Sequence, residues 1–179
     1  RADKIAGEFG HKYIIKGGGD EYQALDDIKN SGVSLILPLN FPSAPDVKDP
    51  YIASSIPLST LKHWEMAPAN AMMVSKAGIS FAFTASGLSN QDDFLKNVRK
   101  CVEYGLSEEA ALKAMTYTPA SMLGADKMVG SLKKGMIANL LITSGNIFKD
   151  DCIVYENWVD GRPYVINDMS LPDLSGSYK

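Results

Sequence analysis

Four polar side chains follow predicted strands, and they are the residues of this chain best placed for chemistry. Lys16 ends one short apolar run, and Asn40 opens the loop that follows a second run. Thr84 ends a third run, and Ser86 comes shortly after it. Because parallel α/β folds build their sites at the carboxyl ends of strands, we take these four residues as a candidate pocket. A lone lysine is more often solvated than catalytic, so Lys16 by itself carries no assignment.

Other residue types that perform catalysis are sparse. His11 precedes its predicted strand, and His63 lies in a long predicted loop beside Trp64. Neither follows a strand, so we interpret both as surface or structural residues and predict no metal ligands in this chain. A serine-hydrolase role for Ser86 is disfavoured, because the Gly-x-Ser-x-Gly elbow is absent and no histidine is a plausible partner.

A glycine run after the first strand invites a phosphate-binding interpretation. Gly17, Gly18, Gly19 and Asp20 stand between a predicted strand and a predicted helix, and helix N-termini attract anions. The run departs from Gly-x-Gly-x-x-Gly, because Tyr22 stands at the last position, and it lacks the Walker lysine followed by serine or threonine. A tight turn is therefore favoured over a phosphate site.

The order of the predicted elements indicates an α/β fold with parallel strands. Strands are predicted at 12–16, 33–37 and 79–84, and helices begin at Asp20, Pro68, Gln91, Ser107 and Thr118. A long loop is predicted at 40–60, where four of the nine prolines lie. Alternation of strands and helices favours parallel strands joined by right-handed crossovers.

The pattern changes after Gly124. Strands are predicted at 138–143 and 153–159, and the latter leads through a tight turn at Asp160 and Gly161 into a strand at 163–166. This is the pattern of a small antiparallel unit, followed by a polar tail at 167–179. We therefore divide the chain into residues 1–124 and residues 125–179.

Composition excludes several classes of partner. The formal net charge of -3 gives no reason to expect nucleic acid or an anionic membrane. The apolar runs are far shorter than a membrane helix needs, so we expect a soluble protein. The start of the chain has no signal-peptide core and no initiator Met, which indicates a piece of a longer protein. A signal peptide on that protein would be invisible here, so cytoplasmic and periplasmic or secreted locations stay open. Cys101 and Cys152 are interpreted as two buried free thiols.

A set of motifs along the chain resembles the C-terminal portion of the amidohydrolase superfamily, in its imidazolonepropionase- and prolidase-like branch. The resemblance covers residues 12–166. Its strongest elements are the Thr-x-x-Pro-Ala sequence at 116–120 and the Gly-Ser-Leu-x-x-Gly turn at 130–135, which lies before a strand with Asn139 in place of the usual aspartate. The other elements are the helix motif at 105–112, the strand at 35–38 and the hairpin around 158–161.

The resemblance implies the last three strands of a (β/α)8 TIM barrel, followed by strands of a small β-sandwich. It implies a parent protein that hydrolyses carbon–nitrogen bonds other than ordinary peptide bonds, or cyclic amides, by means of zinc, manganese or iron. The family holds its metal with a His-x-His pair on the first strand, histidines on the fifth and sixth, and an aspartate on the eighth. Here Lys16 and Gly17 end the sixth-strand equivalent, and Ala85 or Ser86 stands where the aspartate belongs.

Two functions remain open on this pattern. The chain is either the C-terminal fragment of a metal-dependent hydrolase of small-molecule amides, inactive by itself, or a degenerate domain kept as a binding or assembly module. An upstream His-x-His pair would discriminate between them. Because three strands do not close a barrel, the open edge predicts self-association of this chain.

Overall fold

The computed structural model describes residues 2–11 and 13–169. It divides into two compact units, Arg1–Ser131 and Leu132–Lys179, which are described separately below. The sequence pattern predicted a boundary after Gly124. In the structure the boundary follows Ser131, and the segment 125–131 belongs to the first unit. Within the described residues, no helix combines the length and hydropathy needed to cross a membrane.

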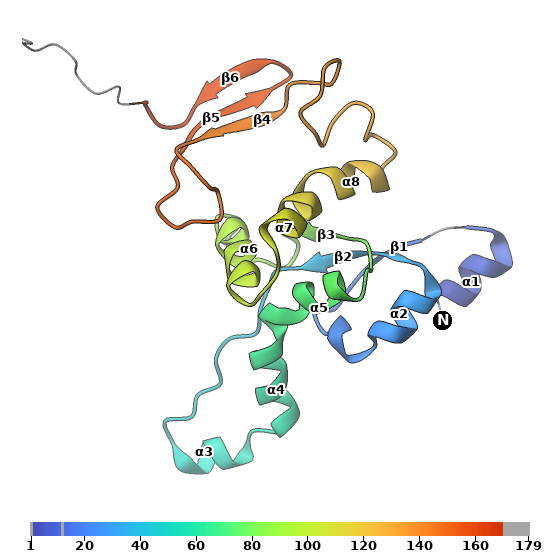
Figure 1. The fold of residues 1–179 in the computed structure, drawn as a ribbon. Helices are drawn as coiled ribbons and strands as arrows, with labels where there is room; N and C mark the ends of the chain where they lie inside the picture. The colour runs from blue at the N-terminus through green and yellow to red at the C-terminus, as the bar shows by residue number, and fades with distance from the viewer. Residues whose placement is uncertain (1, 12, 170–179) are drawn as a thin grey trace, which may run out of the picture. The chain divides into compact units, whose positions relative to one another are not determined.

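A three-stranded parallel sheet lies at the centre of the first unit. β1 (Ile14–Lys16), β2 (Ser34–Pro38) and β3 (Phe81–Thr84) pair in the order β1-β2-β3, as Figure 1 shows. The prediction of parallel strands is confirmed. β2 is central, and Leu35 and Leu37 are buried on it. Predicted and observed strand limits differ by one to two residues at several ends, and Lys12, the predicted start of the first strand, lies outside the described residues.

Helices surround this sheet and supply the rest of the core. Val74, Val98 and Cys101 are fully buried on them. The helices of the first unit are α1 (Ala2–Phe9), α2 (Leu25–Ser31), α3 (Pro50–Ser55), α4 (Leu58–Met66), α5 (Asn70–Lys76), α6 (Asp93–Glu103), α7 (Glu108–Met115) and α8 (Tyr117–Met122), with single 3-10 turns at Glu21–Gln23 and Ala67–Ala69. The Ser107 hydroxyl caps α7 by accepting a hydrogen bond from the Ala110 amide at 3.2 Å, as its capping pattern predicts.

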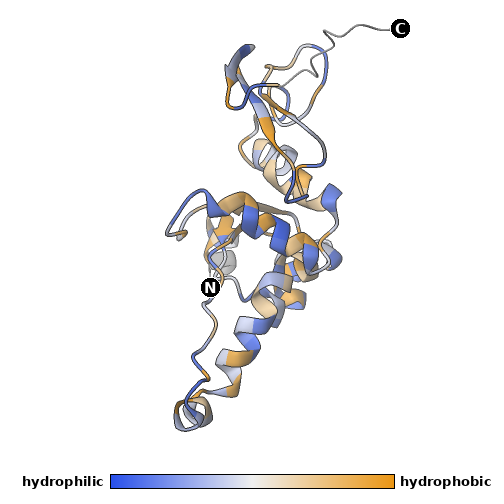
Figure 2. Ribbon diagram, turned by 90° about the vertical axis from the view of Figure 1, so that its left-hand side faces the viewer, coloured by the Kyte–Doolittle hydropathy of each residue, from blue (hydrophilic) through white to orange (hydrophobic). Residues whose placement is uncertain are grey.

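The predicted long loop at 40–60 is wrong in its second half, which is helical. Asp49 caps α3 by accepting from the Tyr51 amide, and Pro50 occupies the first turn, where its missing N–H costs nothing. α3 and α4 extend away from the sheet in Figure 1, and hydrophilic and hydrophobic residues alternate along α4 in Figure 2. Tyr51 is 86% exposed and Leu58 79% exposed, so this helical arm carries uncovered apolar surface.

The second unit is a three-stranded antiparallel sheet. β4 (Leu140–Thr143), β5 (Val154–Val159) and β6 (Arg162–Val165) pair in that order, which confirms the predicted hairpin. Asp160 and Gly161 both have positive φ, +51° and +75°, as a tight two-residue hairpin turn requires. No residue between 132 and 169 is fully buried, so this sheet has no interior of its own in the described structure. Of the predicted tail, residues 170–179 lie outside the described part.

We expect the parallel sheet to carry most of the stability of the first unit. Leu37 is 1% exposed, so Leu37→Ala should lower the free energy of unfolding by about 2–5 kcal/mol through lost burial and a residual cavity. Leu58→Ala removes the same atoms from a side chain that is already in solvent, and it should change stability by less than about 0.5 kcal/mol. Urea unfolding followed by far-UV circular dichroism measures the free energy of unfolding of both variants. Equal losses would contradict the expectation that the parallel sheet carries most of the stability.

Candidate functional site

The structure brings the predicted pocket residues to the carboxyl edge of the parallel sheet. The Lys16 Nζ atom donates a hydrogen bond to the Ser86 Oγ atom at 2.8 Å, although the two residues lie on β1 and beyond β3. The Ser86 amide donates to Thr84 Oγ1 at 3.1 Å. The Asn40 side chain lies against Gly87, whose φ of +93° and close neighbour both favour glycine. Lys16, Asn40 and Ser86 are exposed there, and Thr84 is half-buried.

A buried carboxylate fixes the glycine loop that follows Lys16. Glu21 is 6% exposed, and its Oε1 atom accepts hydrogen bonds from the Gly18 amide at 2.6 Å and the Gly19 amide at 3.1 Å. A methyl group at Gly17 would overlap this carboxylate, so a larger residue at position 17 would force the Glu21 side chain out of this position. A buried charge is costly unless hydrogen bonds satisfy it, and here backbone amides do so.

Asn70 completes this network from α5. Its Nδ2 atom donates to Glu21 Oε2 at 2.5 Å, and its Oδ1 atom accepts from the Tyr22 amide at 2.8 Å. Asn70 is 4% exposed, so both ends of its amide are satisfied inside the protein. The network joins the loop after β1 to a helix almost fifty residues later, and it thereby sets where the backbone of Lys16 leaves the sheet.

The sequence interpretation of this loop was partly wrong. Asp20 was expected to begin a helix; it precedes the single 3-10 turn Glu21–Gln23, and its side chain makes no capping hydrogen bond. Asn70 had no predicted role. A sequence signal did exist, because three successive glycines expose amides that need acceptors. The same bonds disfavour the phosphate interpretation, since Glu21 already occupies the Gly18 and Gly19 amides.

The loop after β2 is held from α6. The Asn97 Nδ2 atom donates to the Leu39 carbonyl at 2.8 Å, and the Lys100 ammonium lies 5.5 Å from the centre of the Phe41 ring. These contacts flank Asn40 on both sides in the sequence. The position of Asn40 is therefore set by α6 together with the end of β2.

Neither histidine belongs to the hydrogen-bonded group of Lys16, Thr84 and Ser86. His11 follows α1 and is exposed. His63 lies on α4 rather than in a loop, so that part of its predicted placement is wrong; its Nδ1 atom is 3.3 Å from the Tyr22 hydroxyl, and the two rings stack with centroids 6.2 Å apart. Among residues 2–11 and 13–169, no three histidine, cysteine, aspartate or glutamate side chains are grouped so that they could hold a metal ion.

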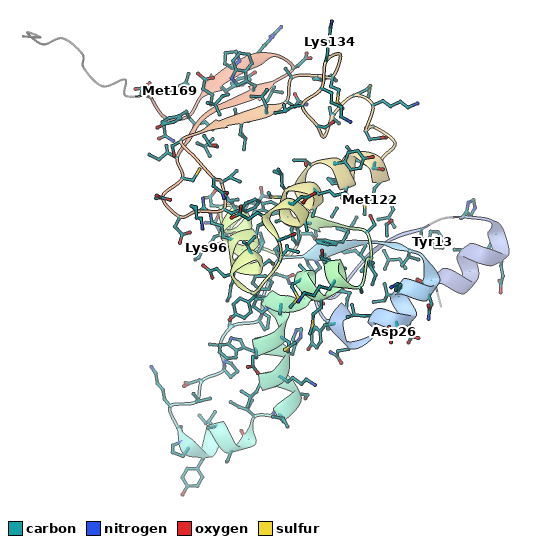
Figure 3. The ribbon with its side chains drawn as sticks, in the orientation of Figure 1. Tyr13, Asp26, Lys96, Met122, Lys134 and Met169 are labelled. Carbon is teal, nitrogen blue, oxygen red and sulfur yellow. The ribbon has the colours of Figure 1, made fainter. Side chains whose placement is uncertain are left out.

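Two hollows of the first unit open at the opposite, amino ends of the strands. One of about 350 Å³ is lined by Ile79 and Phe81 at the start of β3. The other, of about 440 Å³, is lined by Tyr13 and Met122, both labelled in Figure 3. Ligands of parallel α/β sheets bind outside the carboxyl ends of the strands, so we do not place the functional site in either hollow.

The two cysteines differ in their surroundings. Cys101 is buried on α6, and desolvation raises the pKa of its thiol to about 12, so it is a neutral thiol rather than a nucleophile at neutral pH. Cys152 is only half-buried, which corrects the expectation of two buried thiols. Its Sγ atom lies 3.6 Å from the Gly145 carbonyl, just before β5.

Comparison with known proteins gives a consistent family. The model of the amidohydrolase family matches residues 8–164. An amidohydrolase structure from Thermotoga maritima MSB8 is similar with a TM-score of 0.70 and 22% identity, over 90% of this chain and 39% of that one. A prolidase complexed with N-methylphosphonate-L-proline is similar with a TM-score of 0.64 and 18% identity, over 92% of this chain and 42% of that one.

A Xaa-Pro dipeptidase with bound methionine in its active site is also similar, with a TM-score of 0.53 and 19% identity over 90% of this chain and 47% of that one. At these identities the likeness shows the fold. The chain spans about two fifths of the length of the amidohydrolase and prolidase structures. A search of curated proteins finds no match.

The Glu21 network yields a stability test. In Glu21→Gln an amide group would face the Asn70 amide, and two donors would meet where an acceptor is needed. We expect a loss of about 1–3 kcal/mol in the free energy of unfolding. Asp20→Asn removes a charge from the same loop at an exposed side chain with no capping bond and should change stability by less than about 0.5 kcal/mol. Urea unfolding compares the two, and equal stabilities would show that Glu21 is not a structural acceptor.

Proposed function

This chain belongs to the amidohydrolase family, and on that premise we propose that it is the C-terminal part of a metal-dependent hydrolase. The longer protein acts on carbon–nitrogen bonds other than ordinary peptide bonds, or on cyclic amides. The family match over residues 8–164 carries this proposal, because it spans both the parallel sheet and the antiparallel sheet in one order.

In this proposal β1, β2 and β3 are the last three strands of a (β/α)8 barrel. Their parallel order supports it, as does the placement of Lys16, Thr84 and Ser86 at the carboxyl edge, where barrel enzymes carry their sites. β4, β5 and β6 belong to a small β-sandwich. Their sheet has no buried side chain between residues 132 and 169, and it needs a second layer to cover one face.

The family implies a divalent metal, zinc, manganese or iron, and the residues of this chain do not fit one. The Lys16 ammonium stands at the end of β1 and donates to Ser86, so the edge presents a cation and a hydroxyl. Hydroxyls are poor ligands for these metals. A metal ion about 4 Å from the ammonium would be repelled by about 4 kcal/mol per unit charge at an effective dielectric constant near 20, and by about 1 kcal/mol in water. We derive no catalytic step through a metal on this chain.

The chain is therefore inactive by itself in this proposal. Hydrolysis of an amide needs an activated water and a group that accepts its proton. At the carboxyl edge Lys16 is a hydrogen-bond donor, and Ser86 and Asn40 are neutral groups. These side chains can bind and orient a ligand. Water activation would have to come from strands that the longer protein supplies.

The Lys16–Ser86 pair specifically favours a second function. Both residues stand where the resemblance places metal ligands, and together they form a hydrogen bond that a metal site would not contain. This favours a degenerate amidohydrolase domain that serves as a binding or assembly module. The two functions differ in what the longer protein carries upstream.

Metal content and hydrolysis separate these functions. We expect this chain, purified without a chelator or a His-tag, to contain no stoichiometric zinc, manganese or iron by elemental analysis, and to leave N-acyl amino acids and cyclic amides intact. Metal and hydrolysis in the full-length protein would support the hydrolase. Metal absent from both proteins would support the binding module. A metal-loaded chain that hydrolyses these amides would contradict the proposal that it is inactive alone.

We also propose that the isolated chain forms a dimer through the open edge at β1. Ile14 lies on this edge strand and is exposed, and an uncovered strand edge pairs readily with a second copy. The occupant proposed is therefore the β1 strand of another molecule of this chain.

Sedimentation velocity at micromolar concentration tests the dimer. Ile14→Lys places a charge on the edge strand and should convert the dimer to a monomer. Ile52→Lys makes the same change at an exposed residue of α3 and should leave the dimer intact. A monodisperse monomer in the unmodified chain, or dissociation by both variants alike, would exclude pairing through β1.

A further inference from the structure

We infer that the carboxyl edge of the parallel sheet is a binding site for a carboxylate-bearing small molecule, centred on the Lys16 ammonium. Lys16 Nζ is 2.8 Å from Ser86 Oγ, and both residues are exposed at the edge. Within residues 2–11 and 13–169, no ion pair involves Lys16. The ammonium therefore lacks a carboxylate partner in this part of the chain, and a ligand can supply one.

The hydrogen-bond inventory leaves donors for such a ligand. An ammonium has three N–H groups, and Ser86 Oγ accepts from one of them. Because the Ser86 hydroxyl accepts from Lys16, its own hydrogen can donate outward. The Asn40 side-chain amide lies against Gly87, the next residue along, and adds a third polar group at the same edge.

The loop after β1 carries two acidic residues, of which Asp20 is exposed and Glu21 is already engaged. Glu21 is buried and accepts from the Gly18 amide, the Gly19 amide and Asn70. Its hydrogen bonds direct the carboxylate into the loop, where it meets donors rather than the ammonium. The charged group that is hydrogen-bonded to Ser86 is the Lys16 ammonium, and an ammonium attracts anions.

The donor set fits a carboxylate better than a phosphate. One ammonium with two neutral side chains matches the single charge and two oxygens of a carboxylate. Phosphate sites in loops of this kind use clustered backbone amides, and here Glu21 occupies the Gly18 and Gly19 amides. One carboxylate oxygen would accept from Lys16 and the other from Ser86 or Asn40.

This inference stands apart from the hydrolase proposal, because it concerns what this chain binds and needs no activity. It also predicts that the site discriminates between ligands by the sign of their charge. The position that the family resemblance gives to a divalent cation is held here by a side-chain cation, so the edge should select anions and reject metals.

The test is an NMR titration of the 15N-labelled chain with sodium acetate, at ionic strength held constant with sodium chloride. We expect saturable shifts in the amides of Gly17, Ser86 and Gly87. Lys16→Met should weaken binding at least tenfold, and Lys16→Arg should restore most of it. Lys62→Met is the matched control: it removes the same charge from an exposed side chain on α4 and should leave the titration unchanged.

Ser86→Ala provides a second variant at an exposed residue and should weaken acetate binding about threefold to tenfold, the effect of losing one neutral hydrogen bond. Shifts that persist unchanged in Lys16→Met would overturn the inference. Tighter binding of phosphate than of acetate would overturn the carboxylate assignment. Saturable shifts at the same amides with one equivalent of zinc chloride would return the site to a metal.

Discussion

Parallel pairing along β2 brings three distant stretches of chain to one edge, and the rest of the first unit depends on it. Its register places Lys16 beside Ile36 and Pro38 beside Thr84, so residues seventy positions apart can share a hydrogen bond. The chain must cross the sheet again between successive parallel strands. Two of the helices that surround the sheet, α5 and α6, bury Val74 and Val98. A slip of one residue in this register would turn the leucines of β2 out of the core and separate the polar edge.

The hydrogen bonds of Glu21 and Asn70 show how the loop after β1 is held in one conformation. Glu21 supplies the acceptor that the glycine amides need, and Asn70 ties that acceptor to α5. The glycine at position 17 leaves the space that the carboxylate fills. The edge therefore rests on a pre-formed support, which limits the entropy that a bound ligand would have to overcome.

Most of the fold could be predicted from local signals, whereas contacts between distant residues could not. Apolar runs located the three parallel strands, and the Asp160–Gly161 pair located the hairpin, because these features are written in adjacent residues. Asp49 and Pro50 are typical of a helix start, but the prediction of a loop at 40–60 did not use them. The Glu21–Asn70 bond joins residues forty-nine apart, and one sequence carries no trace of such a pairing. The grouping of Lys16, Thr84 and Ser86 could be predicted, because the carboxyl ends of parallel strands lie at the same side of a sheet.

The lack of an interior in the antiparallel unit has a consequence for how the chain loses its structure. β4, β5 and β6 are joined by backbone hydrogen bonds, yet no residue between 132 and 169 is fully buried. Such a sheet opens by local fluctuation at low cost, while the parallel sheet opens only when its core is exposed. We therefore expect the two units to unfold separately, and amide hydrogen exchange would then assign a separate free energy to each. A single melting temperature would describe neither.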